Sequence, residues 1–97
     1  MLDVSLYEIE LRLRNEGYNS YEVKQVLKSL KVLSADLIPI FDSWWKNTAY
    51  PQTDVEGYTF SGLIETYKMH PIAALLTLDW LYKDPFNAKK AITHGIK

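Results

Sequence analysis

The chain has 97 residues, of which 47% are hydrophobic, and its 11 basic and 12 acidic residues give a net charge of −1. This length predicts one domain, residues 1–97, with enough apolar side chains to fold around a single core. The balanced charge excludes a global attraction to nucleic acid or to an anionic membrane. Because there is no cysteine, disulfides and thiol chemistry are excluded as well.

Two further features predict a soluble, cytoplasmic protein without membrane association. The N-terminus, Met1-Leu2-Asp3, lacks the basic region and the apolar run of a signal peptide. The longest apolar segment, Ile72 to Leu78, is far too short to span a bilayer.

Glycine, proline and capping residues divide the chain into about six short helices, which predicts an all-α fold, a compact orthogonal bundle. The first helix runs from about Leu2 to Asn15 and ends at Gly17, a residue suited to a left-handed C′ position. Its apolar residues form two stripes on nearly opposite faces: Leu2, Leu6, Ile9 and Leu13, and then Val4, Tyr7 and Leu11. The second stripe predicts a helix that is either sandwiched or shared with another copy in a homodimer.

The next two helices are expected around residues 20–31 and 34–47. The first of these begins at Ser20 as its cap and turns one apolar face inward: Val23, Val26, Leu27 and Leu30. The other is capped by Ser34 or Asp36, carries Pro39 in its first turn, and ends near Asn47. Residues 48–58 lack helical periodicity and are predicted to form the one substantial loop.

The last three helices are separated by two prolines. A helix from Thr59 or Phe60 to Met69 is expected to stop because Pro71 forces the residue before it out of helical geometry. Pro71 opens a helix so apolar that it is predicted to be the hub of the core. Asp84-Pro85 starts a final short helix that closes at Gly95.

The sequence offers little for catalysis or for metal and cofactor binding. His70 precedes a helix-opening proline, which predicts a cap or a packed ring, and His94 lies in a last helical turn, where a cation suits the dipole. Neither histidine has a carboxylate at a metal-binding spacing. The loop residues 54–57 offer a fragment of a calcium site at most, and the four glycines are not clustered into a phosphate loop. We therefore predict no catalytic residue, no metal and no cofactor.

Residues 11–33 form a helix, a glycine-aromatic turn at Gly17-Tyr18, and a second helix carrying Val23, Val26 and Leu27. This segment resembles ubiquitin-associated-like domains and the repeats of the RecX family, although it covers under a quarter of the chain. Valines stand where such domains usually have small alanines. The resemblance implies that the turn, Gly17 and Tyr18, contributes to partner contact.

The same segment also aligns with a DNA-binding helix-turn-helix that has Gly17 in the turn. Its donors to bases and phosphates would be Asn19, Ser20, Tyr21, Lys24, Gln25 and Lys28. Glu16 departs from the apolar residue that this motif prefers, and the second helix has no arginine. Lys89 and Lys90 either add phosphate contacts or pair with the acidic N-terminal helix.

The chain has 3 tryptophans, 7 tyrosines and 3 phenylalanines, and ten of these aromatic residues lie between Phe41 and Phe86. Such rings either fill a small core or anchor a partner. We assign to the core Phe41, Phe60, Leu75, Leu78, Trp80 and Leu81. Trp44 and Trp45 point about 100° apart on a helix, so that one can be buried while the other reaches the surface.

The predicted function is a small non-enzymatic protein-interaction module, a regulator or adaptor, whose small size and lack of motifs suggest a bacterial or phage origin. Its predicted partner-binding residues are Trp44, Trp45, Tyr50 and Tyr58. The alternatives are a DNA-binding regulator and, third, a small enzyme in which His70 meets an acidic residue in an apolar pocket.

Overall fold

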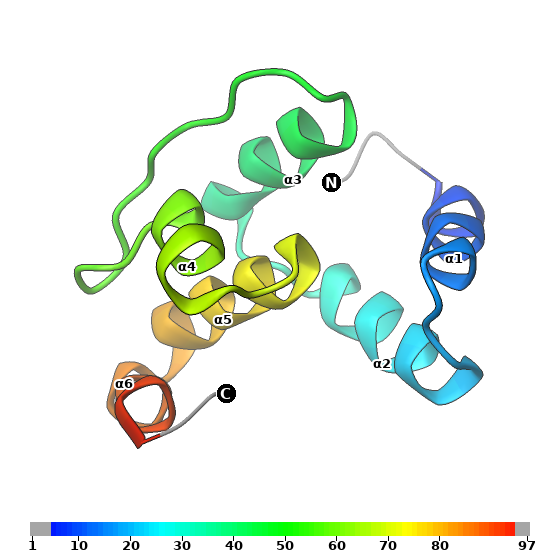
Figure 1. The fold of residues 1–97 in the computed structure, drawn as a ribbon. Coiled ribbons are helices and arrows are strands. Elements are labelled where there is room, and N and C mark those ends of the chain that lie inside the picture. The colour runs from blue at the N-terminus through cyan, green and yellow to red at the C-terminus, as the bar shows by residue number, and fades with distance from the viewer. Residues whose placement is uncertain (1–4, 95–97) are drawn as a thin grey trace.

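The computed structural model describes residues 5–94, and this part of the chain consists of helices joined by short connections and one longer loop (Figure 1). The helices are α1 (Leu6–Asn15), α2 (Ser20–Lys31), α3 (Ile38–Trp45), α4 (Phe60–Tyr67), α5 (Pro71–Lys83) and α6 (Pro85–His94), with a 3₁₀ turn, η1 (Ala35–Leu37), before α3. Among the described residues the only β-type pairing is an isolated bridge between Val55 and Tyr58. The predicted all-α fold is confirmed.

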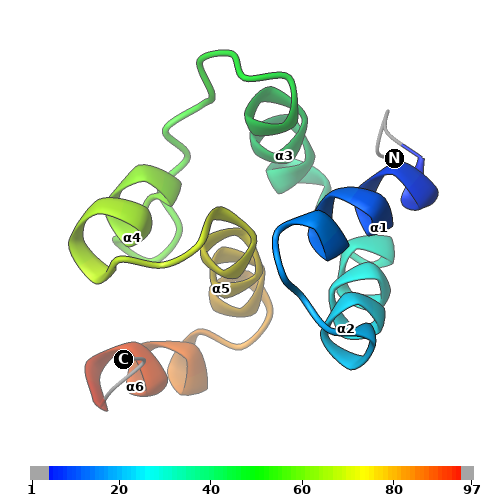
Figure 2. The ribbon, with the colours of Figure 1, turned by 45° about the vertical axis from the view of Figure 1, so that its right-hand side comes forward.

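Helix α5 is the centre of the bundle, as its composition predicts. It contacts α2, α4, α6 and η1, and Figures 1 and 2 show it between α2 on one side and α4 and α6 on the other. Leu75, Leu78 and Leu81 are buried on α5 and join one cluster with Phe41 of α3 and Phe60 of α4. Burial of these large side chains supplies the main stabilisation of the fold.

The assignment of Trp80 to the core is wrong, because 40% of this residue is exposed. Trp80 follows Ala73 and Leu76 at helical spacing, and the three residues form a stripe that α5 turns away from its buried residues. A helix that is apolar on every side carries no polar stripe to mark its outer face. The sequence pattern could therefore not show which side of α5 would face solvent.

The junction between α1 and α2 follows the prediction in outline but not in its cap. Gly17 has a φ of 97°, the left-handed conformation expected of it. The cap of α2 is Asn19 and not Ser20, which is the first helical residue. Asn19 Oδ1 accepts the Glu22 amide at 2.8 Å, while Glu22 Oε1 accepts the Asn19 amide at 3.0 Å. This reciprocal capping box satisfies two amides and outcompetes a cap at the next residue.

The limits of α3 and α4 differ from the expected ones by a few residues. Ser34 precedes the 3₁₀ turn and not α3 itself, while Pro39 lies in the first turn of α3 as predicted. Helix α4 ends at Tyr67, before the expected Met69, because Lys68 adopts a left-handed conformation with a φ of 58°. The expected helical residues before Ser5 and the closing Gly95 lie outside the described part of the chain.

The predicted loop between α3 and α4 is irregular but anchored. Glu56 and Gly57 both have positive φ values, 54° and 88°, as in the two central residues of a type I′ turn. The flanking residues, Val55 and Tyr58, exchange amide-to-carbonyl hydrogen bonds of 2.8 and 2.9 Å. Val55 is buried against the core and fixes the turn on the bundle.

A buried carboxylate, Asp79 of α5, ties the connection between α2 and α3 to the central helix. Its Oδ1 accepts hydrogen bonds from the Ser34 amide at 3.0 Å and from the Ser34 hydroxyl at 2.8 Å. Its Oδ2 lies 2.9 Å from Nζ of Lys83, which also donates to the Val32 carbonyl at 2.6 Å. Burial alone would raise the pKa of Asp79, but the hydrogen bonds from Lys83 and Ser34 outweigh burial and hold the pKa below its ordinary value.

We predict that Asp79→Asn lowers the free energy of unfolding by about 1–3 kcal/mol, since it removes a charged acceptor of hydrogen bonds. Because folding lowers the pKa of Asp79, its stabilisation is complete above the unfolded-state pKa of about 4 and is lost as the pH falls through the folded-state value. Urea unfolding at several pH values below 6 checks this.

The matched control for this experiment is Glu65→Gln, at an exposed carboxylate of α4. In Glu65→Gln the free energy of unfolding should fall with decreasing pH as much as it does in the wild type. In Asp79→Asn it should fall less. Equal acid dependence in the wild type and in Asp79→Asn would contradict the role assigned to this carboxylate.

Candidate functional site

The four predicted partner-binding residues are all partly buried and pack against the core. Trp44 and Trp45 form the last turn of α3, while Tyr50 and Tyr58 lie in the loop that follows. Their ring contacts fall into two groups. Tyr50 packs edge-on against Phe60 at a centroid distance of 4.9 Å, and Tyr58 contacts Tyr67 at 6.3 Å.

The tryptophans form the other group, around Phe41. The Phe41 ring is fully buried and lies 6.0 Å from the Trp44 ring and 5.8 Å from the Trp45 ring. The two indoles contact each other at 6.3 Å in an edge-to-face arrangement. Helix geometry allowed one of these rings to be buried and the other to reach the surface. Both rings lie half-buried at the margin of the core.

Arg12 of α1 covers the tryptophan pair. Its guanidinium carbon lies 4.3 Å from the centre of the Trp44 ring and 4.8 Å from that of the Trp45 ring. Cations are attracted to the faces of indole rings at these distances. Arg12 Nε also pairs with Glu16 Oε2 at 3.3 Å, one helical turn along α1, which fixes the guanidinium over the rings.

Glu16 continues this network to His70, the N-cap residue of α5. Nδ1 of His70 accepts the Ile72 amide at 3.1 Å and lies 3.0 Å from the Tyr18 hydroxyl, which therefore donates to it. Since Nδ1 is an acceptor, the neutral ring carries its proton on Nε2 and donates it to Glu16 Oε1 at 3.1 Å. The predicted cap role of His70 is confirmed, and its ring also packs against Tyr18 at 5.4 Å and Trp44 at 6.5 Å.

The side chains of this network, Tyr18, His70 and Glu16, are arranged to form hydrogen bonds and not to abstract a proton from a substrate. Partial burial, and after it the charges of Glu16 and Glu22, raise the pKa of Tyr18, so its hydroxyl keeps its proton at neutral pH. His70 does meet an acidic residue, as the enzyme alternative requires. However, the side chains of His70 and Glu16 are 37% and 32% exposed, so that they do not form the enclosed apolar pocket of that hypothesis.

The residues of the DNA-binding alternative lie along α2 and its cap. Two of them have structural partners: Asn19 caps the helix, and the Ser20 hydroxyl accepts a hydrogen bond from Arg14 at 3.3 Å. The other four are exposed to solvent: Tyr21, Lys24, Gln25 and Lys28.

Lys89 and Lys90 of α6, for which phosphate contacts and pairing with the N-terminal helix were both considered, lie on another helix. Figures 1 and 2 place α2 and α6 on different sides of α5, so the two helices are not neighbours. Lys89 pairs with Glu56 of the loop at 2.7 Å, and not with the acidic N-terminal helix.

Exposed aromatic residues on α5 and α6 were not predicted as contact residues. Phe86 of α6 is 75% exposed, and Trp80 of α5 is 40% exposed. Helical periodicity relative to Ala88 and Ile92 could have placed Phe86 on an outer face. Tyr7 and Leu11, the second apolar stripe of α1, are exposed as well, so they are available for a contact between copies.

Comparison of the chain with family models, curated proteins and solved structures finds no match. The resemblance of residues 11–33 to ubiquitin-associated-like domains and RecX repeats therefore stays a prediction. Within residues 5–94, no three metal-ligating side chains lie together, and no helix is long and apolar enough to cross a membrane.

We predict that Arg12→Ala lowers the free energy of unfolding by about 1–2 kcal/mol, since it removes a cation shared by two indoles and an ion pair with Glu16. It should also change the tryptophan emission, because both rings become more exposed to water. Urea unfolding monitored by fluorescence measures both effects.

Arg14→Ala is the matched control. Arg14 pairs with Glu10 at 3.0 Å on the same helix, but its guanidinium lies over no aromatic ring among residues 5–94. It should change stability by less than about 0.5 kcal/mol and leave the emission unchanged. The same emission change in both variants would show that Arg12 does not cover the tryptophans.

Proposed function

We propose that the chain is a small, non-enzymatic protein-interaction module of the cytoplasm, a regulator or adaptor that binds a partner protein through the aromatic surface at the end of α3. This surface consists of Trp44 and Trp45 with the guanidinium of Arg12, and it extends along the loop through Tyr50 and Tyr58. The observation that carries the proposal is the half-buried tryptophan pair held under Arg12.

Two physical reasons support this choice. Tryptophan, tyrosine and arginine are the residue types that contribute most to binding energy at protein interfaces. Here the indoles are also held before any partner arrives, by Phe41 beneath them and by Arg12 over them. A preorganised surface loses less conformational entropy on binding than mobile side chains do.

The loop residues of the proposed surface, Tyr50 and Tyr58, are also held in place before a partner binds. Tyr50 is held edge-on by Phe60, and Tyr58 by the turn at Glu56-Gly57 and by its contact with Tyr67. Each tyrosine combines apolar contact area with a hydroxyl that can donate or accept a hydrogen bond. A partner would therefore present an apolar side chain to the indoles and polar groups to the loop.

We predict that Trp45→Ala abolishes capture of a specific partner protein from a matched bacterial lysate, while capture by the wild type survives nuclease treatment. Loss of a central interface tryptophan typically weakens binding by 2 kcal/mol or more, about thirtyfold, which is enough to remove a partner during washing. Quantitative mass spectrometry of the captured proteins measures the effect.

Tyr21→Ala is the control, because it removes an aromatic ring that is 71% exposed on a different helix. It should capture the same partner as the wild type. Circular dichroism of each variant establishes that it is folded. A partner that Trp45→Ala retains at the wild-type level would overturn the proposed surface.

The second candidate function, DNA binding through α2, rests on the exposed lysines Lys24 and Lys28, which form no ion pair with another residue of the described part of the chain. In this alternative the protein acts as a dimer through Tyr7 and Leu11 of α1. Retention of nucleic acid alone in the capture experiment would support it.

We predict for this alternative that Lys24→Glu with Lys28→Glu abolishes binding to duplex DNA and that wild-type affinity falls steeply as salt rises, because each phosphate contact releases counterions. Gel-shift titrations at two salt concentrations measure both effects. Absence of any shift by the wild type at low salt would eliminate the alternative.

A further inference from the structure

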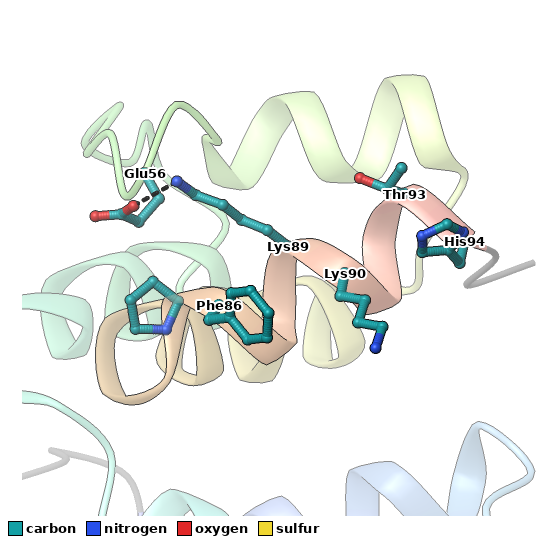
Figure 3. A pocket seen from close by; sticks show the side chains of 7 residues that line it. Glu56, Phe86, Lys89, Lys90, Thr93 and His94 are labelled. Atoms are coloured by element: carbon teal, nitrogen blue, oxygen red, sulfur yellow. Dashed lines mark ion pairs between the residues drawn. The ribbon is translucent and has the colours of Figure 1, made fainter.

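A cleft of about 530 Å³ is lined by residues of α6 and of the loop before α4, and neither Trp44 nor Trp45 lines it. It lies between α6 and the turn at residues 55–58 (Figure 3). Glu56 forms one side, and Phe86, Lys89, Lys90 and Thr93 of α6 line the other.

The walls of this cleft are fixed by ordinary structural contacts. Ala88 and Ile92 turn the inner face of α6 into the core. On the opposite side, the turn is closed by the hydrogen bonds of Val55 with Tyr58, and Asp54 Oδ1 accepts the Gly57 amide at 2.9 Å. The cleft is therefore formed between two elements that are each held in place before a ligand binds.

The charges of the cleft leave one cation without a counterion. Lys89 reaches across to Glu56, with Nζ 2.7 Å from Oε1, so these two charges neutralise each other (Figure 3). Lys90 extends in another direction and forms no ion pair with any residue that the structure describes. No second carboxylate lines the cleft.

Beside this cation lies an aromatic ring that the fold leaves in water. Phe86 is 75% exposed and precedes Lys90 by four residues, so both side chains lie on the same face of α6. Thr93 adds a hydroxyl one turn further along this face (Figure 3). The combination offers one apolar contact, one positive charge and one hydroxyl hydrogen-bonding group.

We propose that this cleft binds a short acidic segment of a partner protein, with a carboxylate at Lys90 and a neighbouring apolar side chain against Phe86. The cleft is complementary in charge to such a segment: one exposed lysine, without an ion pair in the described part of the chain, matches one carboxylate, and the Phe86 ring beside it adds an apolar contact. This surface is separate from the one formed by Trp44 and Trp45, and it would serve a second contact of the same or another partner.

The same charges disfavour nucleic acid as the occupant. A polyanion gains its affinity from several phosphate contacts, whereas the cleft offers one lysine without an ion pair among the described residues, and its other lysine, Lys89, is already paired with Glu56. The net charge of −1 gives no long-range attraction to a polyanion either. A protein segment that carries single carboxylates between apolar residues fits the cleft better.

The test is a titration of the ¹⁵N-labelled full chain with two peptides, acetyl-Glu-Phe-Glu-Leu-amide and acetyl-Lys-Phe-Lys-Leu-amide, followed by amide chemical shifts. We expect saturable shifts in residues 85–94 with the acidic peptide and none there with the basic one. Phe86→Ala should weaken binding of the acidic peptide by about tenfold, as loss of an interface anchor does. Lys90→Glu should reverse the preference between the two peptides.

Two controls separate this surface from others. Lys68→Glu makes the same change of charge on the connection between α4 and α5 and should keep the preference for the acidic peptide. Trp45→Ala should bind the acidic peptide like the wild type, so the failure of one surface is distinguishable from the failure of the other. Chemical shifts outside residues 85–94 establish that each variant is folded.

Three results would overturn the proposal. The first is the absence of saturable shifts in α6 with the acidic peptide at millimolar concentration. The second is a Lys90→Glu variant that still prefers the acidic peptide. The third is tighter binding of an eight-residue oligothymidine at the same residues, which would make the cleft a single-stranded nucleic-acid site.

Discussion

The packing of this molecule depends on a single helix, α5, and on the buried carboxylate that α5 carries. Leucines on α5 supply the hydrophobic contacts to α4 and α6, but such contacts are not directional. Hydrogen bonds, which are directional, come from Asp79 and its neighbour Lys83. Asp79 accepts hydrogen bonds from the amide and the hydroxyl of Ser34, and Lys83 donates one to the carbonyl of Val32. These hydrogen bonds attach the connection between α2 and α3 to α5, shortly before α3 begins. A carboxylate without these donors would be costly to bury.

The N-terminal helices are joined to this centre by a second, more exposed set of contacts. Arg12 links α1 to the indoles of α3, Glu16 links Arg12 to His70, and His70 caps α5. Each contact alone is worth little at a solvent-exposed site. They share side chains, however, so the conformational entropy lost by ordering Glu16 supports two contacts at once. The partner-binding surface proposed at Trp44 and Trp45 is thus positioned by residues from α1 and α5 that are distant in the sequence.

Local rules predicted much of this fold, and long-range contacts account for what they missed. The prolines at 39, 71 and 85 and the left-handed Gly17 mark helix limits correctly because their effect is confined to neighbouring residues. The cap at Asn19 was missed by one position because two adjacent residues are both good caps. Trp80 was placed in the core because α5 has no polar stripe, and only the positions of α2 and α6 determine which face stays exposed. The contact of Arg12 with the tryptophans joins residues more than 30 positions apart, so no local sequence pattern could have predicted it.

The exposed residues also show why a small helical domain can carry two contact surfaces. Six short helices cannot cover every apolar side chain, and a chain of this size leaves a large fraction of its surface in water. Several aromatic rings are exposed here, such as Tyr7 on α1 and Tyr82 on α5, and a single exposed ring needs no functional explanation. Two places differ from this background. At Trp44 and Trp45 a cation holds two half-buried indoles, and at Phe86 an exposed ring lies beside an unpaired lysine in a cleft with fixed walls. In both places an apolar group and a charged group are presented together by elements that are already ordered, and this combination, more than aromatic content, distinguishes a binding surface from an uncovered core residue.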